Sequence, residues 1–159
     1  MIVSSFIAAF LIIRREHTHC NNLALVLRLI QAVKNRALFY QDSFQKSIEI
    51  ASETREFRSL DFLTEFTNKI SEGLTPPAAW ESAVRNSHIN MTMPEKDVLI
   101  HFGKDLCACN REKIEEYSDQ AIEMLEDFRT VAKENRNKKS RTTGVITVSA
   151  ALIIVLMFI

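Results

Sequence analysis

The sequence predicts an all-α protein, a bundle of about six helices flanked by N- and C-terminal transmembrane helices. Only three glycines and three prolines occur in 159 residues, too few for the many tight turns of an all-β fold. Through the middle of the chain, apolar residues recur at helical spacing. All 20 basic and 20 acidic residues lie between Arg14 and Arg141. The chain therefore divides into an N-terminal membrane segment (1–13), a helical bundle (14–141) and a C-terminal transmembrane helix (142–159).

Both ends of the chain are apolar and uncharged. The C-terminal segment, TTGVITVSAALIIVLMFI, would extend about 27 Å as a helix, close to the ~30 Å hydrocarbon core of a bilayer. The N-terminal segment, MIVSSFIAAFLII, would extend only about 20 Å, so a short span, an interfacial helix and a buried core segment are all open. Arg14 and Arg15 follow the first segment, and the basic run 133–141 precedes the second. Because positive flanks stay on the cytoplasmic side, the bundle is expected in the cytoplasm.

The first half of the bundle contains three predicted helices. The first covers about residues 22–40, with Asn21 or Asn22 as its cap. The second covers about 42–55, and the third begins near Ser59 and ends at Gly73, which tolerates the left-handed conformation beyond a helix. The predicted core residues of these helices are Leu23, Val26, Leu27, Ile30, Val33, Ala37, Phe44, Ile48, Ala51, Leu60, Phe62, Leu63, Phe66 and Ile70.

Three further helices are expected in the second half. Thr75 caps the fourth, with prolines in its first turn, and Thr92 with Glu95 forms a capping box before the fifth. The last begins after Asn110, and no glycine or proline interrupts it before Gly144, so one helix is predicted to run from the bundle into the C-terminal segment. The predicted core residues here are Ala79, Trp80, Val84, Val98, Leu99, Phe102, Leu106, Ile114, Tyr117, Ala121, Leu125, Phe128 and Ala132.

The sequence offers no motif for enzymatic chemistry or for nucleic-acid binding. The formal net charge is zero, which gives no basis for attraction to a polyanion. Neither a glycine-rich phosphate loop before Lys-Ser/Thr nor a His-Glu-x-x-His zinc motif is present. We therefore expect no enzyme activity, no nucleic-acid partner and no cofactor, and we assign no catalytic, cofactor-binding or metal-ligating residue.

Two small groups of histidine and cysteine suggest an alternative function, in metal or redox sensing. They are His17, His19 and Cys20, and His101, Cys107 and Cys109. The Cys-x-Cys spacing differs from the Cys-x₂₋₄-Cys pairs of structural zinc sites, and a helix would splay the two cysteines by about 200°. We interpret them as packing cysteines. The alternative function is a membrane-anchored regulator that senses metal or redox state through these groups.

The order of three motifs resembles the stage III sporulation protein AB family. They are AAWESAV (residues 78–84), FGKDL (residues 102–106) and the basic run that leads into a segment with Gly144. The chain departs from the family pattern at Cys107, where relatives have glycine, at Asn110, where they have aspartate, and at Ile114, where glutamine is common. If Cys107 had a positive φ it would carry a steric cost; if it is helical, the turn has moved toward Asn110.

The resemblance implies a function as well as a fold. The family is similar to the cytoplasmic helical domain of the platform protein of type II secretion and type IV pilus machines. This implies a non-enzymatic membrane platform of the mother cell–forespore channel, or feeding tube, required for endospore formation. It would lie in the mother-cell membrane around the forespore. Its partners would be the secretion-type ATPase of its operon and other membrane proteins of the channel. Formation of a homo-oligomer is possible. We expect the ATPase on loops 73–77 and 88–94, taken to be farthest from the membrane.

Overall fold

The computed structural model describes the backbone of residues 2–157 and the side chains of residues 18–134. Its α-helices are α1 (Ile2–Asn35), α2 (Phe44–Glu53), α3 (Asp61–Ser71), α4 (Pro76–Asn86), α5 (Met93–Ala108) and α6 (Arg111–Met157). A short π-helix, η1 (Arg36–Tyr40), follows α1, and a 3₁₀ turn, η2 (Arg55–Phe57), follows α2. The described backbone contains no strand. The predicted all-α bundle of about six helices is confirmed.

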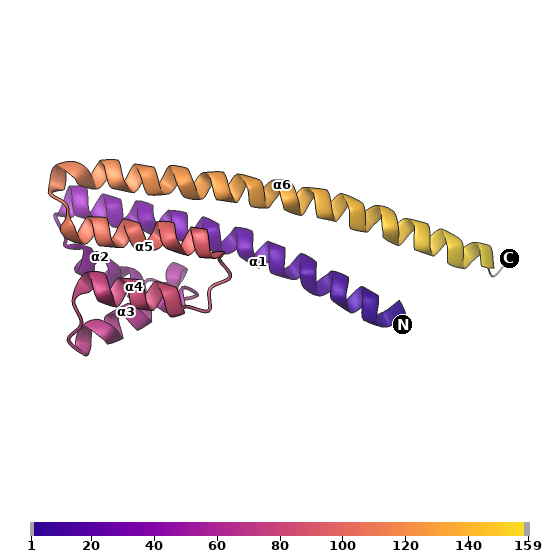
Figure 1. Cartoon of the computed structure of the whole chain (residues 1–159), viewed down its shortest axis with the longest axis horizontal. Helices are drawn as coiled ribbons and strands as arrows, with labels where there is room; N and C mark the ends of the chain where they lie inside the picture. Colours follow the sequence, from indigo (N-terminus) through magenta and orange to yellow (C-terminus); the bar gives the residue numbers. More distant parts are fainter. Residues whose placement is uncertain (1, 158–159) are drawn as a thin grey trace.

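The two terminal helices form the frame of the molecule. They run antiparallel and side by side, and both extend beyond the bundle on the side where the N- and C-terminus lie (Figure 1). With 34 residues α1 is about 51 Å long, and with 47 residues α6 is about 70 Å long. The predicted continuity of the last helix is thus confirmed.

The expected start of the first bundle helix near Asn22 was wrong. The helix runs unbroken from Ile2, and Asn21 and Asn22 lie inside it. No glycine or proline interrupts this stretch, and Cys20 and Leu23 on either side of the asparagines are both buried. Packing of this turn against the core therefore outweighs the weak preference of asparagine for a cap.

No helix within the part of the chain with described side chains is long and apolar enough to cross a membrane. The side chains of the two predicted membrane segments, residues 1–13 and 142–159, lie outside that part. Their assignment stays a prediction from the sequence.

The short helices are layered against this frame. α5 packs on α6 and α4, α4 packs on α3, and α2 contacts α1 and α3 (Figure 1). Nearly all predicted core residues are buried, whereas Ile70, Ile114, Tyr117 and Phe128 are only partly buried. Through these contacts, every helix contributes side chains to one continuous apolar core.

Most of the predicted helix ends follow from local chemistry. Gly73 has φ +92°, and the N–H of the next residue, Leu74, donates to the carbonyl of Lys69 at 3.1 Å, closing α3. Before α5, the Glu95 carboxylate accepts from the Thr92 N–H at 2.7 Å, as a capping box requires. Thr75 occupies the cap position of α4, but its side chain forms no capping hydrogen bond.

A close contact in the core joins α4 to α5. Trp80 of α4 is fully buried, and its Nε1–H donates to the carbonyl of Leu99 at 2.8 Å. A Cβ on Gly103 would lie 2.2 Å from Trp80 Nε1, so the two helices can approach this closely only because Gly103 has no side chain. Three phenylalanine rings meet the indole edge-on with centroids 5.0 to 5.7 Å away: Phe44, Phe62 and Phe66.

Gly103→Ala is expected to destabilise the protein. The overlap with the indole should cost about 3 kcal/mol, the upper part of the usual overpacking range, against the ~1 kcal/mol by which alanine favours a helix. The net loss in unfolding free energy is about 2 kcal/mol and can be measured by urea unfolding of the purified chain. In a Trp80→Leu background the same change should cost much less. Equal costs in both backgrounds would show that the indole is not the obstacle.

Candidate functional site

His19 of the first group and Cys107 of the second lie at opposite ends of α5. His19 Nε2 is 2.9 and 3.0 Å from the two carboxylate oxygens of Glu95, in the first turn of α5. Cys107 lies in its last turn, about 18 Å farther along the helix. Within the described side chains no three His, Cys, Asp or Glu residues come together as metal ligands. The side chain of His17 lies outside this part, and His101 is exposed midway along α5.

The environment of the cysteines does not favour thiolate chemistry. Cys20 is buried in the core. Burial, and then the neighbouring Cys109, raise the pKa of Cys107 to about 11. Burial is also the main reason why the pKa of Cys109 is raised. Because the thiolate is the nucleophile and the metal ligand, these shifts weaken the sensor alternative.

The backbone at Cys107 is helical and does not have a positive φ. α5 continues through Cys107 to Ala108, and Cys109 is the first extended residue, with φ −86° and ψ 156°. Among the described residues other than glycine, only Gln41 has a positive φ. The turn has therefore moved toward Asn110, whose carbonyl accepts from the Lys113 N–H at 2.9 Å as α6 begins.

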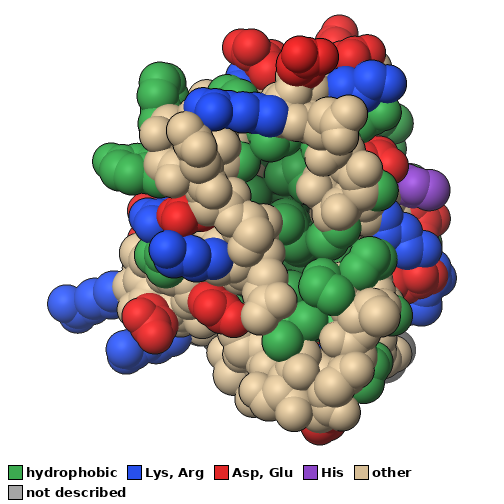
Figure 2. All heavy atoms as spheres, turned by 90° about the vertical axis from the view of Figure 1, so that its left-hand side faces the viewer, with side chains coloured by type: hydrophobic (Ala, Val, Ile, Leu, Met, Phe, Trp, Pro, Cys, Tyr) green, Lys and Arg blue, Asp and Glu red, His purple; other side chains and the backbone are tan. Residues whose placement is uncertain are grey.

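The end of the bundle opposite the chain termini carries an exposed apolar surface, here called the distal face. Its residues are Phe39 and Tyr40 of η1, which are 77% and 71% exposed, and Leu74 of the α3–α4 loop, which is 39% exposed. Beside them is a hollow of about 380 Å³, bounded by the turn into α2, the first turn of α4 and the α5–α6 turn. Figure 2 looks onto this end and shows apolar side chains in the depression between polar segments. Exposed aromatic side chains of this kind are typical of protein interfaces.

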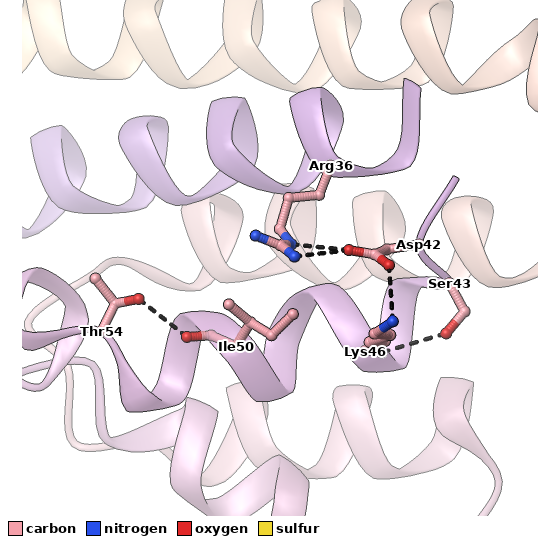
Figure 3. Close-up of polar contacts among 6 residues, drawn as sticks. All are labelled: Arg36, Asp42, Ser43, Lys46, Ile50 and Thr54. Carbon is pink, nitrogen blue, oxygen red and sulfur yellow. Dashed lines mark hydrogen bonds and ion pairs between the residues drawn. The ribbon is translucent and has the colours of Figure 1, made fainter. Parts of the chain in front are cut away.

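An ion-pair cluster fixes the turn that presents the distal face (Figure 3). Arg36 donates to Asp42 Oδ2 from Nη2 at 2.8 Å and from Nε at 3.0 Å, and Lys46 Nζ lies 3.2 Å from Oδ1. Ser43 caps α2 by accepting from the Lys46 N–H at 3.3 Å. Burial raises the pKa of Asp42, but the hydrogen bonds from Lys46 and Arg36 outweigh it, so the pKa lies below its usual value.

The same turn holds the aromatic side chains in place. Gln41 is left-handed with φ 58°, a conformation that costs a non-glycine residue about 1–2 kcal/mol. The Arg36 guanidinium lies over the Tyr40 ring, 5.4 Å from its centroid. Arg111 of α6 donates to the carbonyl of Leu38 at 2.7 Å. These contacts fix the backbone of η1 and the position of the Tyr40 ring at the surface.

Loops 73–77 and 88–94 do not lie at one end of the bundle, as the expectation that both are farthest from the membrane assumed; docking of the ATPase on them stays a prediction. Loop 73–77 belongs to the distal face, where Pro76 and Pro77 line the hollow. Loop 88–94 lies at the other end of α4, on the side toward the chain termini (Figure 1). α4 has 11 residues and spans about 16 Å, and this length separates the two loops. The sequence did not identify Phe39 or Leu74 as surface residues. For Phe39 the available signal was the pair of aromatics, Phe39 and Tyr40, directly before a turn.

The fold is that of a helical sporulation protein. A solved structure titled "Stage III sporulation protein AB (SpoIIIAB)" matches with a TM-score of 0.65 at 16% identity, over 76% of this chain and 98% of that one. The family model described as stage III sporulation protein AB matches residues 1–159, so the chain belongs to this family and its role lies in sporulation. No curated protein sequence matches the chain.

Cys107 should react slowly with iodoacetamide in the folded protein. At pH 8 a thiol of pKa about 11 is about 0.1% thiolate, compared with about 10% at its ordinary value of 9.0. The rate, followed by peptide mass spectrometry, should be about 100-fold below that of the urea-unfolded chain and should still be rising at pH 10. A plateau near pH 9 in the folded chain would contradict the raised pKa.

Asp42→Asn should remove part of the acid sensitivity of the protein. A carboxyl with a lowered folded pKa stabilises the fold above its unfolded value of 3.8, and this contribution is lost as the pH falls through the folded pKa. The thermal midpoint of Asp42→Asn should thus lie below that of the wild type by a constant amount above about pH 5. The gap should shrink below pH 3.8. Glu53→Gln, at an exposed residue, is the matched control, and the same pH profile in both variants would refute the role of Asp42.

Proposed function

We propose that this protein is a non-enzymatic membrane platform of the mother cell–forespore channel, and that its distal face binds the secretion-type ATPase. The support for the platform is the register of its two long helices. Arg111 contacts the carbonyl of Leu38 and aligns the start of α6 with the end of η1. From this contact, Arg14 lies about 36 Å along α1, and the basic run 133–141 lies about 33 to 45 Å along α6.

Both basic flanks therefore lie at about the same level, beyond which α1 and α6 continue in the same direction (Figure 1). Two membrane segments that enter one bilayer from one side require this arrangement, because positive flanks stay at the cytoplasmic surface. In this orientation the bundle is in the cytoplasm of the mother cell, and the distal face is about 40 Å from the membrane. The two membrane segments are then free to contact other membrane proteins of the channel.

The distal face is suited to an ATPase in the cytoplasm because it is rigid and apolar. The Tyr40 ring lies under the Arg36 guanidinium, which is itself paired with Asp42, so little conformational entropy of Tyr40 is lost when a partner covers it. Aromatic anchors beside a hollow commonly carry most of the free energy of an interface. The sensor alternative has no comparable support, because His19 and Cys107, one from each group, lie at opposite ends of α5.

Phe39→Ser combined with Leu74→Ser should strongly weaken ATPase binding without unfolding the bundle. Both side chains are exposed, so the urea midpoint should change little, while loss of apolar anchors should lower the fraction of co-purified ATPase by about tenfold or more. The measurement is affinity purification of the tagged full chain co-expressed with the ATPase of its operon. Glu53→Ser, at an exposed residue of α2 outside both apolar surfaces, is the control. Unchanged ATPase recovery with the double variant would refute docking at the distal face.

A further inference from the structure

A second apolar surface lies on the side of the bundle, between α5 and α6. It is a groove of about 460 Å³, here called the lateral groove, and its apolar lining includes Pro94, Val98, Phe102, Tyr117, Met124 and Phe128. From Pro94 to Asp105 it follows α5 for about 16 Å, or three helical turns. This length matches one face of a short amphipathic helix.

Large apolar side chains are exposed at the edges of this groove. Met124 lines it and is 52% exposed. Met93, directly before Pro94, is 56% exposed, and Val131, one turn beyond Phe128 on α6, is 57% exposed. These three are half of the six large apolar residues that are exposed in the described part of the chain, and the distal face accounts for the other three. Methionine at an exposed groove adapts its shape readily to a partner helix.

The charge of the groove indicates what its partner carries. Asp97, His101 and Asp105 follow one another at four-residue spacing along α5, all exposed. Among the described residues, the groove lining contains two carboxylates and no lysine or arginine. Neither carboxylate forms an ion pair within residues 18–134, although acidic residues elsewhere in the bundle, such as Glu56 and Glu81, are paired. Within residues 18–134, the acidic edge of the groove is thus not neutralised by an ion pair.

We propose that the lateral groove binds an amphipathic helix of another protein, with lysine or arginine flanking its apolar face. The apolar floor would take the apolar face of that helix, and Asp97 and Asp105 would meet its basic flanks. An anionic lipid surface is disfavoured by the same carboxylates. A second copy of this chain is disfavoured because a two-fold contact here would bring two acidic edges together. This surface is separate from the distal face and does not depend on ATPase docking.

Photo-crosslinking in sporulating cells tests this proposal with the full chain. Benzoylphenylalanine placed at Met124 should crosslink to one segment of a different protein, and mass spectrometry of the crosslinked peptide should show a helical apolar repeat with basic flanks. The same group placed at Glu53, which is exposed on α2, is the position control. Crosslinks only to lipid, only to another copy of the chain or only to an acidic segment would each overturn the proposal, as would the absence of any crosslink.

Charge variants separate specific docking from chance contact. Asp97→Lys with Asp105→Lys should lower the crosslink yield from Met124 by about tenfold, and Asp97→Asn with Asp105→Asn should lower it less. Glu53→Lys with Glu72→Lys changes the net charge equally at remote exposed sites and should leave the yield unchanged. A yield that is insensitive to Asp97 and Asp105 would refute the role of the acidic edge. The crosslink should persist in Phe39→Ser with Leu74→Ser, and its loss there would overturn the assignment to a separate surface.

Discussion

The contact between Trp80 and Gly103 determines how the bundle is assembled. The indole lies against the backbone of α5 and bonds to the Leu99 carbonyl, while phenylalanines of α2 and α3 surround its ring. This contact sets the position of α5, and α5 in turn contributes to both candidate surfaces: its last turn borders the distal hollow, and its outer side forms the wall of the lateral groove. A shift of α5 would therefore alter both surfaces together.

Polar contacts then fix the frame around this core. Lys34 of α1 lies 2.7 Å from Asp119 of α6, and Arg111 reaches the carbonyl at Leu38, so α1 and α6 are held in one register near the distal end. At the other end of α5, His19 joins α1 to Glu95. Of these contacts, the Lys34–Asp119 ion pair is partly exposed and contributes about 0–1 kcal/mol, whereas His19 and Glu95 are largely buried. The role of these contacts is to select one alignment among those that the apolar surfaces of the two long helices would allow.

The sequence predicted the helices better than it predicted the surfaces, for physical reasons. Gly73 and the Thr92–Glu95 box mark helix ends through contacts within a few residues, so these ends could be read directly. Asn22 carried a similar local preference but lies mid-helix, because burial of Leu23 dominates there. The location of loop 88–94, the separation of the cysteine groups and the exposure of Phe39 depend on how helices far apart in sequence pack, and no local pattern encodes that.

The unbroken course of α1 and α6 has a mechanical consequence. Neither helix contains a glycine or proline from the distal end of the bundle to the level of the basic flanks, so there is no built-in hinge between them. The two helices together behave as a stiff double rod. A load applied at Phe39, in η1 directly after α1, would be transmitted toward the chain ends as a tilt or twist of both helices. With the basic flanks as the pivot, the movement at the chain ends relative to that at the distal face would depend on the lengths of the helix segments on the two sides of these flanks.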